Sequence, residues 1–522
     1  MTVSIPSQVP WASDFLGLSQ RYGKRVAVVD RDGATTYADL FAHAAGIGNA
    51  VLAASAKACE PVGTLLPNGR AAVAASYGVT VSGAAEARLN TALAEAELAH
   101  CLKTAGIRIV VTDRERAALV GRLGAKAVIA EDAGRTDLAQ CRFEAPAADG
   151  WGRVGFTSGT TGAPKGIVHS QGGRWLANVL LRATLPKTPG AGDNVLLMTP
   201  FSHGAALMTY AFLDTGAAVT LLNGVDPAVA LPMIETGSVN QMFAPPTVLA
   251  KLLSATGGRT YRGLAAIYTG TAPLSGALYA QARRTFGPVI RITYGKSEIW
   301  NPITVLAPDE AEAWYAGDGE PSTSCVGWPA SGVEIRIDKL AAEPGEGSTA
   351  SETNAGHRDI GEVKLRSRHM FLGHAVDGRF VPENEDGFHA TGDLGFIDER
   401  GRLQLVGRAA DVMKSGGYKV LPEEVEAELR PSALPAEIAV ISLPSIYWGE
   451  IVTLVVAGTG DPPDLTQAIG RMTAYKRPRL IAMLDAVPRN SIGKIVRRRA
   501  RELVLEKYAL EDGPRPRLIA KS

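Results

Sequence analysis

Short apolar runs alternate with alanine-rich segments over the first two thirds of the chain. Runs rich in β-branched residues recur between residues 24 and about 340, such as RVAVVD at 25–30 and NVLLMTP at 194–200. Alanine-rich segments lie between them, such as YADLFAHAAGIGNAVLAA at 37–54. This alternation is the pattern of βα units. It predicts an α/β fold in which the large N-terminal part contains sheets covered by helices.

The pattern changes at about residue 320 and again after Arg408. From 320 to 407 short strands are separated by turns, and the DERG turn inside LGFIDERGRLQLVG (394–407) predicts a hairpin in a β-rich subdomain. The polar stretch 341–356 predicts an exposed loop. Beyond Arg408 the α/β pattern returns, with an expected helix at 421–430 and strands at 437–444 and 451–458.

The sequence from Arg497 to Gly513, RRRARELVLEKYALEDG, predicts a closing helix. We expect Arg497, Arg498 and Arg499 to form a solvated basic face of it. A boundary near 408–411 divides the chain into an N-terminal domain, 1–409, and a small α/β C-terminal domain, 410–522, of about 110 residues.

Length and charge exclude several classes of protein. With 522 residues the chain is too long for one simple binding module. Its 54 Lys and Arg against 53 Asp and Glu leave a net charge of +1, so no basic excess is available to bind nucleic acid. No membrane span is expected, because the most apolar stretch, 204–222, carries Asp214 at its middle.

The four cysteines, Cys59, Cys101, Cys141 and Cys325, are far apart in sequence and form no C-x-x-C pair. This spacing argues against a disulfide scaffold and a structural zinc site. The N-terminus lacks the basic and apolar regions of a secretory signal. A cytoplasmic protein is therefore expected.

Residues 157–166, TSGTTGAPKG, combine four hydroxyl side chains, three glycines and Lys165 directly after a short apolar strand. Glycines let backbone N–H groups approach an anion, hydroxyls donate hydrogen bonds, and lysine adds a positive charge. The segment predicts a phosphate-binding loop. It is not a Walker A loop, because the G-x-x-x-x-G-K-[ST] spacing is absent.

This loop resembles the phosphate loop of the adenylate-forming superfamily, which includes acyl-CoA synthetases, luciferases and peptide-synthetase adenylation domains. Further segments match the family's motifs in the family's order over nearly the whole chain. They are PFSHG at 200–204, YGKSE at 294–298, TGD at 391–393, Gly407-Arg408 with Asp411 and Lys414, GGY at 416–418, and Gly493-Lys494.

The resemblance implies that a carboxylate attacks the α-phosphate of ATP, giving an acyl-adenylate and pyrophosphate, and that a thiol such as that of coenzyme A then displaces AMP. It implies ATP, Mg²⁺ and coenzyme A as ligands. The catalytic residues it implies are Thr157, Lys165, His203, Glu298 and Lys494, with Glu298 and Ser297 at the metal. The implied nucleotide- and CoA-binding residues are Thr157, Ser158, Gly159, Thr160, Thr161, Lys165, Gly270, Thr271, Ala272, Tyr294, Gly295, Lys296, Ser297, Asp393, Arg408, Lys414, Gly416, Gly417 and Tyr418.

By the same resemblance, Tyr294 packs on adenine, Asp393 accepts the ribose hydroxyls with help from Arg408, and Lys494 bridges carboxylate and phosphate during adenylation. The segment 414–418 is expected to reach the active site only when the mobile C-terminal domain rotates for thioester formation. One position departs from the family. Ala410 stands where the domain pivot usually has Asp or Lys, which leaves the stabilisation of the pivot open.

The substrate is expected to be a non-amino acid. Adenylation domains for amino acids commonly have Phe-Asp where this chain has Phe201-Ser202, and a buried ammonium without a partner is costly. His203 lies where acyl- and aryl-CoA synthetases line the acid pocket. Small or apolar residues nearby, Ala205, Ala206, Thr271, Ala272 and Trp300, favour a mostly hydrophobic acid.

Three functions remain open at this point. The leading hypothesis is a carboxylic acid:CoA ligase. The alternatives are an adenylating enzyme that loads a carrier protein in trans, and a nucleotide-binding protein without catalytic activity. Lys165, Glu298 and Lys494 argue against the last.

Overall fold

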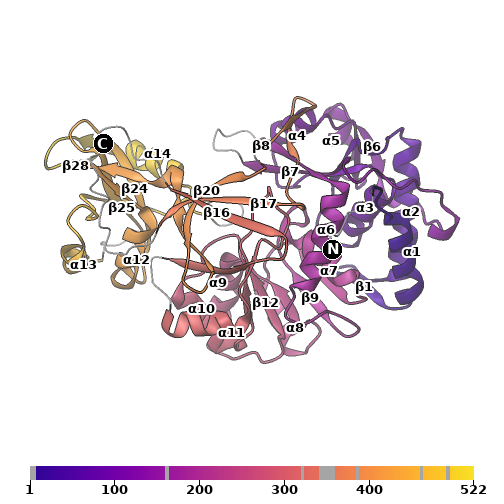
Figure 1. Cartoon of the computed structure of the whole chain (residues 1–522), viewed down its shortest axis with the longest axis horizontal. Coiled ribbons are helices and arrows are strands. Elements are labelled where there is room, and N and C mark those ends of the chain that lie inside the picture. The colour runs from indigo at the N-terminus through magenta and orange to yellow at the C-terminus, as the bar shows by residue number, and fades with distance from the viewer. Residues whose placement is uncertain are drawn as a thin grey trace.

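The computed structural model describes residues 7–158, 164–318, 323–339, 359–383, 387–458, 463–489 and 494–521. In this part the chain forms four larger β-sheets and a two-stranded hairpin near the C-terminus. In Figure 1 the indigo N-terminal helices and the orange-to-yellow segments that follow residue 412 lie at opposite ends of the long axis. The predicted α/β architecture with a β-rich part is confirmed.

A seven-stranded sheet has the order β13-β12-β11-β9-β10-β1-β2. Its neighbours are parallel except for the antiparallel pair β1 and β2. Because parallel strands end at the same edge, the segments that follow β12 and β13 emerge side by side. The strands are β1 (Val26–Asp30), β2 (Gly33–Thr36), β9 (Asn194–Leu197), β10 (Ala218–Leu221), β11 (Gln241–Phe243), β12 (Ala266–Thr269) and β13 (Ile290–Ile292).

An eight-stranded sheet has the order β19-β18-β8-β7-β4-β3-β5-β6. The strands from β6 to β7 run parallel, whereas β7, β8, β18 and β19 are joined by antiparallel pairs. The strands are β3 (Pro61–Leu65), β4 (Ala85–Arg88), β5 (Ile109–Thr112), β6 (Lys126–Ile129), β7 (Trp151–Ser158), β8 (Pro164–Ser170), β18 (Gly373–Val376) and β19 (Arg379–Pro382).

A six-stranded antiparallel sheet has the order β14-β15-β21-β20-β17-β16. The hairpin predicted from the DERG turn is confirmed as β20–β21, and its register places Asp393 opposite Arg408. The strands are β14 (Thr304–Val305), β15 (Ser324–Pro329), β16 (Val333–Lys339), β17 (Gly361–Ser367), β20 (His389–Ile397) and β21 (Leu403–Arg408).

The fourth sheet has the order β23-β22-β25-β24, with β26 paired to β25. All its strands follow residue 412, and they include both strands predicted in this region. They are β22 (Met413–Ser415), β23 (Tyr418–Val420), β24 (Glu437–Ser445), β25 (Gly449–Ala457) and β26 (Leu480–Leu484). The helix expected at 421–430 is confirmed as α12 (Pro422–Ala433).

The remaining helices of the described residues cover these sheets. They are α1 (Trp11–Tyr22), α2 (Tyr37–Ala53), α3 (Arg70–Val81), α4 (Glu95–Ala105), α5 (Ala117–Arg122), α6 (Gln171–Ala183), α7 (Ala206–Leu213), α8 (Pro227–Glu235), α9 (Pro246–Ser254), α10 (Gly276–Phe286), α11 (Pro308–Ala313), α13 (Thr466–Arg471) and α14 (Arg497–Lys507), with short helical turns η1 (Ala130–Asp132), η2 (Leu138–Gln140), η3 (Phe201–Ala205), η4 (Trp314–Asp318) and η5 (Ala409–Asp411).

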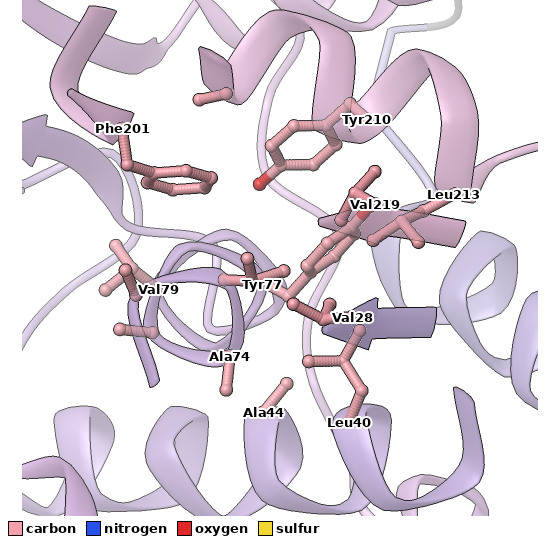
Figure 2. Close-up of a cluster of buried hydrophobic side chains, with 14 of the residues drawn as sticks. Val28, Leu40, Ala44, Ala74, Tyr77, Val79, Phe201, Tyr210, Leu213 and Val219 are labelled. Atoms are coloured by element: carbon pink, nitrogen blue, oxygen red, sulfur yellow. The ribbon is translucent and has the colours of Figure 1, made fainter. Parts of the chain in front are cut away.

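The largest core joins α2, α3 and α7. Figure 2 shows Ala44 from α2 beside Ala74 from α3, with Tyr77 directed toward Tyr210 of α7. The helices approach closely at Gly78, where an added Cβ would lie 2.8 Å from the Ala44 carbonyl oxygen. A larger residue there would push α2 and α3 apart.

Two predictions for the C-terminal region are wrong in part. The closing helix ends at Lys507, and Tyr508–Glu511 forms strand β27, which pairs with β28 (Arg517–Ala520). Tyr508 is held there because its hydroxyl hydrogen-bonds the backbone of Met483. Arg497 is not solvated; it pairs with Glu423 at 2.7 Å and Glu426 at 2.5 Å.

The apolar stretch 204–222 is core, as predicted, because it forms the end of η3, α7 and β10, which are largely buried. Asp214 at its middle pairs with Arg182 at 3.4 Å. Within the described ranges, no helix is both long and apolar enough to cross a bilayer. The loop expected at 341–356 lies outside the described residues.

Candidate active site

Asp393 is buried and lies at the centre of a group of polar side chains. Strand β20 carries it opposite Arg408, whose Nε is 3.4 Å from Asp393 Oδ1. Lys296 Nζ lies 3.3 Å from Oδ2 and donates to the Thr391 carbonyl at 2.8 Å. The Tyr294 hydroxyl also donates to Oδ2. The predicted nucleotide-binding residues of three separate motifs therefore meet at one carboxylate.

Tyr294 is 6% exposed, so most of its ring is covered in this conformation. Burial, and then the Asp393 charge, raise the pKa of Tyr294 well above its ordinary value. Its hydroxyl consequently keeps its proton and serves as a donor to Asp393. The predicted packing of this ring on adenine stays a prediction.

Lys494 joins the same group from the C-terminal part of the chain. Burial, and then the Arg408 charge, lower the pKa of Lys494 to about 8, while Asp393 and Glu298 act in the opposite direction. The lysine ammonium thus shares one electrostatic environment with Glu298 and Asp393. The fold brings together residues that are about 100 to 200 positions apart in sequence.

Two of the predicted nucleotide-binding segments, 270–272 and 294–297, lie at one edge of the seven-stranded sheet. They do so because they follow the adjacent parallel strands β12 and β13. Gly270 is required there because an added Cβ would lie 2.5 Å from the Thr293 carbonyl oxygen. Thr271 has φ +71°, and its buried Oγ1 has no hydrogen-bond partner. Ala272 follows at the same edge.

Hydrogen bonds hold the backbone carbonyl groups of the two expected metal ligands, Ser297 and Glu298. His169 Nε2 lies 2.9 Å from the Ser297 carbonyl oxygen, and the Phe371 N–H donates to the Glu298 carbonyl at 2.8 Å. The described residues contain no cluster of three or more His, Cys, Asp or Glu side chains suited to a metal. One carboxylate, Glu298, fits Mg²⁺, which commonly binds one or two carboxylates together with substrate phosphates.

The expected phosphate loop includes the last residues of β7 and the first of β8, which pair antiparallel with Thr157 opposite Lys165 and Ser158 opposite Pro164. Lys165 is exposed at the start of β8. Gly159, Thr160 and Thr161 lie outside the described residues, as do the side chains of Thr157 and Ser158. Their predicted contacts with phosphate stay predictions.

The glycines at 416–417 form the turn between β22 and β23, with φ +59° and +83°. The Lys414 N–H donates to Glu450, and the Tyr418 ring stacks on Tyr475 with centroids 4.6 Å apart. Both contacts lie within the C-terminal part. The structure does not link this segment to Asp393 by any described hydrogen bond or ion pair.

His203 lies in the turn η3 with backbone angles outside the helical range, φ −116° and ψ −138°. Burial, and then the charges of Arg153 and Arg88, lower the pKa of His203 to about 4. The imidazole is therefore neutral at pH 7. These two arginines were not identified from sequence, although the charged residues that alternate with alanine in AEAR at 85–88, between apolar segments, are a signal that could have found Arg88.

Both the sequence and the fold are similar to those of known proteins. The family model of the AMP-binding enzymes matches residues 18–374. The chain is 26% identical over 494 residues to the 2-succinylbenzoate–CoA ligase of Bacillus subtilis (92% of this chain, 95% of the relative). It is 28% identical over 480 residues to a feruloyl-CoA synthase of Amycolatopsis (89% and 93%).

Among solved structures, ATP-bound MatB of Rhodopseudomonas palustris superposes with a TM-score of 0.77 at 25% identity, covering 94% of this chain and 98% of MatB. The matched family model spans well over half of the chain. The chain therefore belongs to the AMP-binding enzymes, the adenylate-forming superfamily.

Proposed function

We propose that this protein is an ATP-dependent carboxylic acid:CoA ligase. It converts acid and ATP to acyl-AMP and pyrophosphate, and then transfers the acyl group to coenzyme A with release of AMP. The observation that carries the proposal is that the half-buried Lys494 interacts electrostatically with Asp393 and Glu298. The relatives support it, because both are named for the formation of CoA thioesters.

In the adenylation step two anions, the carboxylate and the α-phosphate, must approach each other. Lys494 would neutralise part of this charge, and Lys165 with the hydroxyls and N–H groups of the 157–166 segment would hold the outer phosphates. Asp393 would accept the ribose hydroxyls once its present donors rearrange. Glu298 and Ser297 would hold Mg²⁺, which would further neutralise the phosphates.

We further propose that residues 410–522 act as a mobile domain. In a second orientation Lys414, Gly416, Gly417 and Tyr418 would line the path of the pantetheine arm. Coenzyme A is the proposed acceptor. A carrier protein acting in trans is the competing acceptor, and incubation of the enzyme with each thiol distinguishes the two acceptors.

Because all four cysteines are free thiols, we place the protein in the reducing cytoplasm.

Product analysis tests the reaction class. With ATP, Mg²⁺, coenzyme A and a panel of carboxylic acids, we expect AMP and pyrophosphate in equal amounts with the acyl-CoA, measured by liquid chromatography and mass spectrometry. Removal of Mg²⁺ with EDTA should abolish all three products. Direct formation of ADP and orthophosphate would contradict the proposal, because it would mean attack at the γ-phosphate.

The pKa of Lys494, lowered to about 8, predicts a pH limit for adenylation. Only the charged ammonium form of Lys494 can neutralise the reacting anions, and kcat/KM reports the ionisation of groups in the free enzyme. We therefore expect kcat/KM for adenylation to fall about tenfold per pH unit above about pH 8. Pyrophosphate exchange between pH 6 and 10 measures it. Lys494→Arg, which stays charged, should lose this decline; the same decline in Lys494→Ala would show that another group causes it.

A further inference from the structure

Four charged side chains lie together in the interior of the N-terminal part: Glu86 and Arg88 from β4, Arg153 from β7 and Arg174 from α6. The side chains of Glu86, Arg88 and Arg174 are 0%, 1% and 0% exposed. Three guanidinium groups thus share one carboxylate, which leaves a surplus of two positive charges. Burying unpaired charges costs several kcal/mol each, so this surplus calls for an explanation.

Arg174 has a structural role. It donates to Glu86 at 3.1 Å, to the Tyr210 hydroxyl at 2.6 Å and to the Gly152 carbonyl at 3.3 Å. These partners satisfy both of its terminal nitrogens. The surplus therefore belongs to Arg88 and Arg153.

Arg88 and Arg153 are incompletely paired. Arg88 Nε lies 2.9 Å from Glu86, but its Nη1 and Nη2 are buried without hydrogen-bond partners. Arg153 donates through Nη2 to the Ser202 carbonyl at 3.2 Å, and its Nε has no partner. Among the described residues, no carboxylate lies within ion-pair distance of Arg153. As a whole residue Arg153 is only partly buried, whereas the side chain of Arg88 is 1% exposed.

The surplus charge faces aromatic rings beside the candidate active site. The guanidinium of Arg153 lies 4.4 Å from the Trp300 ring, and that of Arg88 lies 5.9 Å from the same ring and 5.4 Å from Phe201. Such contacts recover only part of the free-energy cost of burying an unpaired charge.

This location connects directly to the expected metal ligand and the acid pocket. Trp300 follows Glu298 by two residues, and the His169 ring packs on Trp300 with centroids 5.6 Å apart while Nε2 contacts the Ser297 carbonyl. Ser202, whose carbonyl oxygen accepts a hydrogen bond from Arg153, also has a buried Oγ without a hydrogen-bond partner. An anion between Ser202 and Arg153 would satisfy both side chains.

We propose that the acid substrate carries a second carboxylate at the end remote from the one that is activated, and that Arg153, supported by Arg88, binds it. This inference rests on the proposed function and specifies its substrate class. Trp300 and Phe201 pack against the apolar body of the acid, so a hydrophobic spacer joins the two carboxylates. The neutral His203 adds a hydrogen-bonding group without adding charge.

The test compares dicarboxylic acids of four to ten carbons, and aryl dicarboxylic acids, with their monomethyl esters, which have nearly the same shape but a neutral remote end. For the preferred diacid we expect kcat/KM for acyl-CoA formation at least about 100-fold above that of its monoester. In Arg153→Met this preference should disappear, because activity on the diacid falls by at least that factor. Activity on the monoester should change less than about threefold.

Arg182→Met is the matched control, because Arg182 is a partly exposed guanidinium paired with Asp214, and this variant should keep the preference. Arg153→Lys keeps the charge without the fork and should keep part of the preference. If thermal melting shows that Arg153→Met does not fold, Arg153→Lys is the variant that tests the inference.

Two results would overturn the inference: a wild-type preference for the monoester, or an equal loss on both acids in Arg153→Met, which would assign Arg153 to the reacting carboxylate. Turnover of monoesters without turnover of diacids would leave the ligase function intact and refute only the second carboxylate. Failure of every acid to form a CoA thioester would refute the proposed function itself.

Discussion

Lys494→Ala should slow adenylate formation by roughly 30- to 1000-fold, a loss of about 2 to 4 kcal/mol of transition-state stabilisation. The lysine is useful mainly while carboxylate and phosphate are forced together, and it lies beside Asp393 and Glu298 in the present arrangement. Thioester formation from a supplied acyl-adenylate should therefore be almost unchanged. Single-turnover measurements of the two half-reactions, with Lys507→Ala as an exposed control on α14, separate the effects.

Gly417→Leu should give the opposite pattern, because a side chain there would obstruct the proposed path of the pantetheine arm without touching ATP. Gly417 has φ +83°, so backbone strain alone is a second source of loss. Gly258→Leu controls for this strain, since Gly258 has φ +80° and open space where a Cβ would lie.

An equal loss in both half-reactions for Lys494→Ala would contradict the two-orientation mechanism. Ala410 would then need to be tested as the pivot.

Glu86→Gln should lower the free energy of unfolding of the N-terminal part by about 3–5 kcal/mol, the cost of leaving buried charges without their partner. Burial by itself raises the pKa of Glu86, but the charges of Arg88 and Arg174 overcome this effect and hold the pKa below its usual range. The carboxylate is therefore ionised at pH 7, and its removal leaves the buried guanidinium groups of Arg88 and Arg174 without a carboxylate partner. Urea denaturation followed by tryptophan fluorescence measures the loss.

Glu60→Gln is the matched control, because Glu60 pairs with Arg108 at 3.1 Å on the surface, and exposed pairs contribute about 0–1 kcal/mol. If Glu86→Gln is too unstable to purify, the double variant Glu86→Gln/Arg174→Met removes one of the unpaired cations and should recover part of the stability. A loss no larger than that of Glu60→Gln would show that solvent or a bound anion neutralises the arginines.

The order of motifs along the chain was sufficient to predict the family, the α/β architecture and the residues around Asp393. These predictions succeed because each motif is short and local: Tyr294 to Glu298 follow one strand, and Asp393 and Arg408 are joined by one hairpin. A motif of this kind consists of consecutive residues, so it can be recognised without knowledge of contacts between distant parts of the chain.

Other features depend on contacts that no local pattern encodes. Arg497 looked like part of a solvated basic run, yet it pairs with Glu423 and Glu426, about 70 residues earlier. The strand β27 interrupts a sequence that favours helix, because pairing with β28 outweighs local propensity. In both cases tertiary contacts decided the outcome.

By itself, then, the sequence determined the fold class, the adenylate-forming family and the motifs whose residues surround Asp393. Only the tertiary structure decided that Arg497 pairs with Glu423 and Glu426, and that Arg88 and Arg153, on neighbouring strands β4 and β7, place an uncompensated positive charge beside Trp300. The physical reason is that charge balance in an interior is a property of side chains that converge from separate elements. A surplus charge becomes visible only when all its neighbours are known.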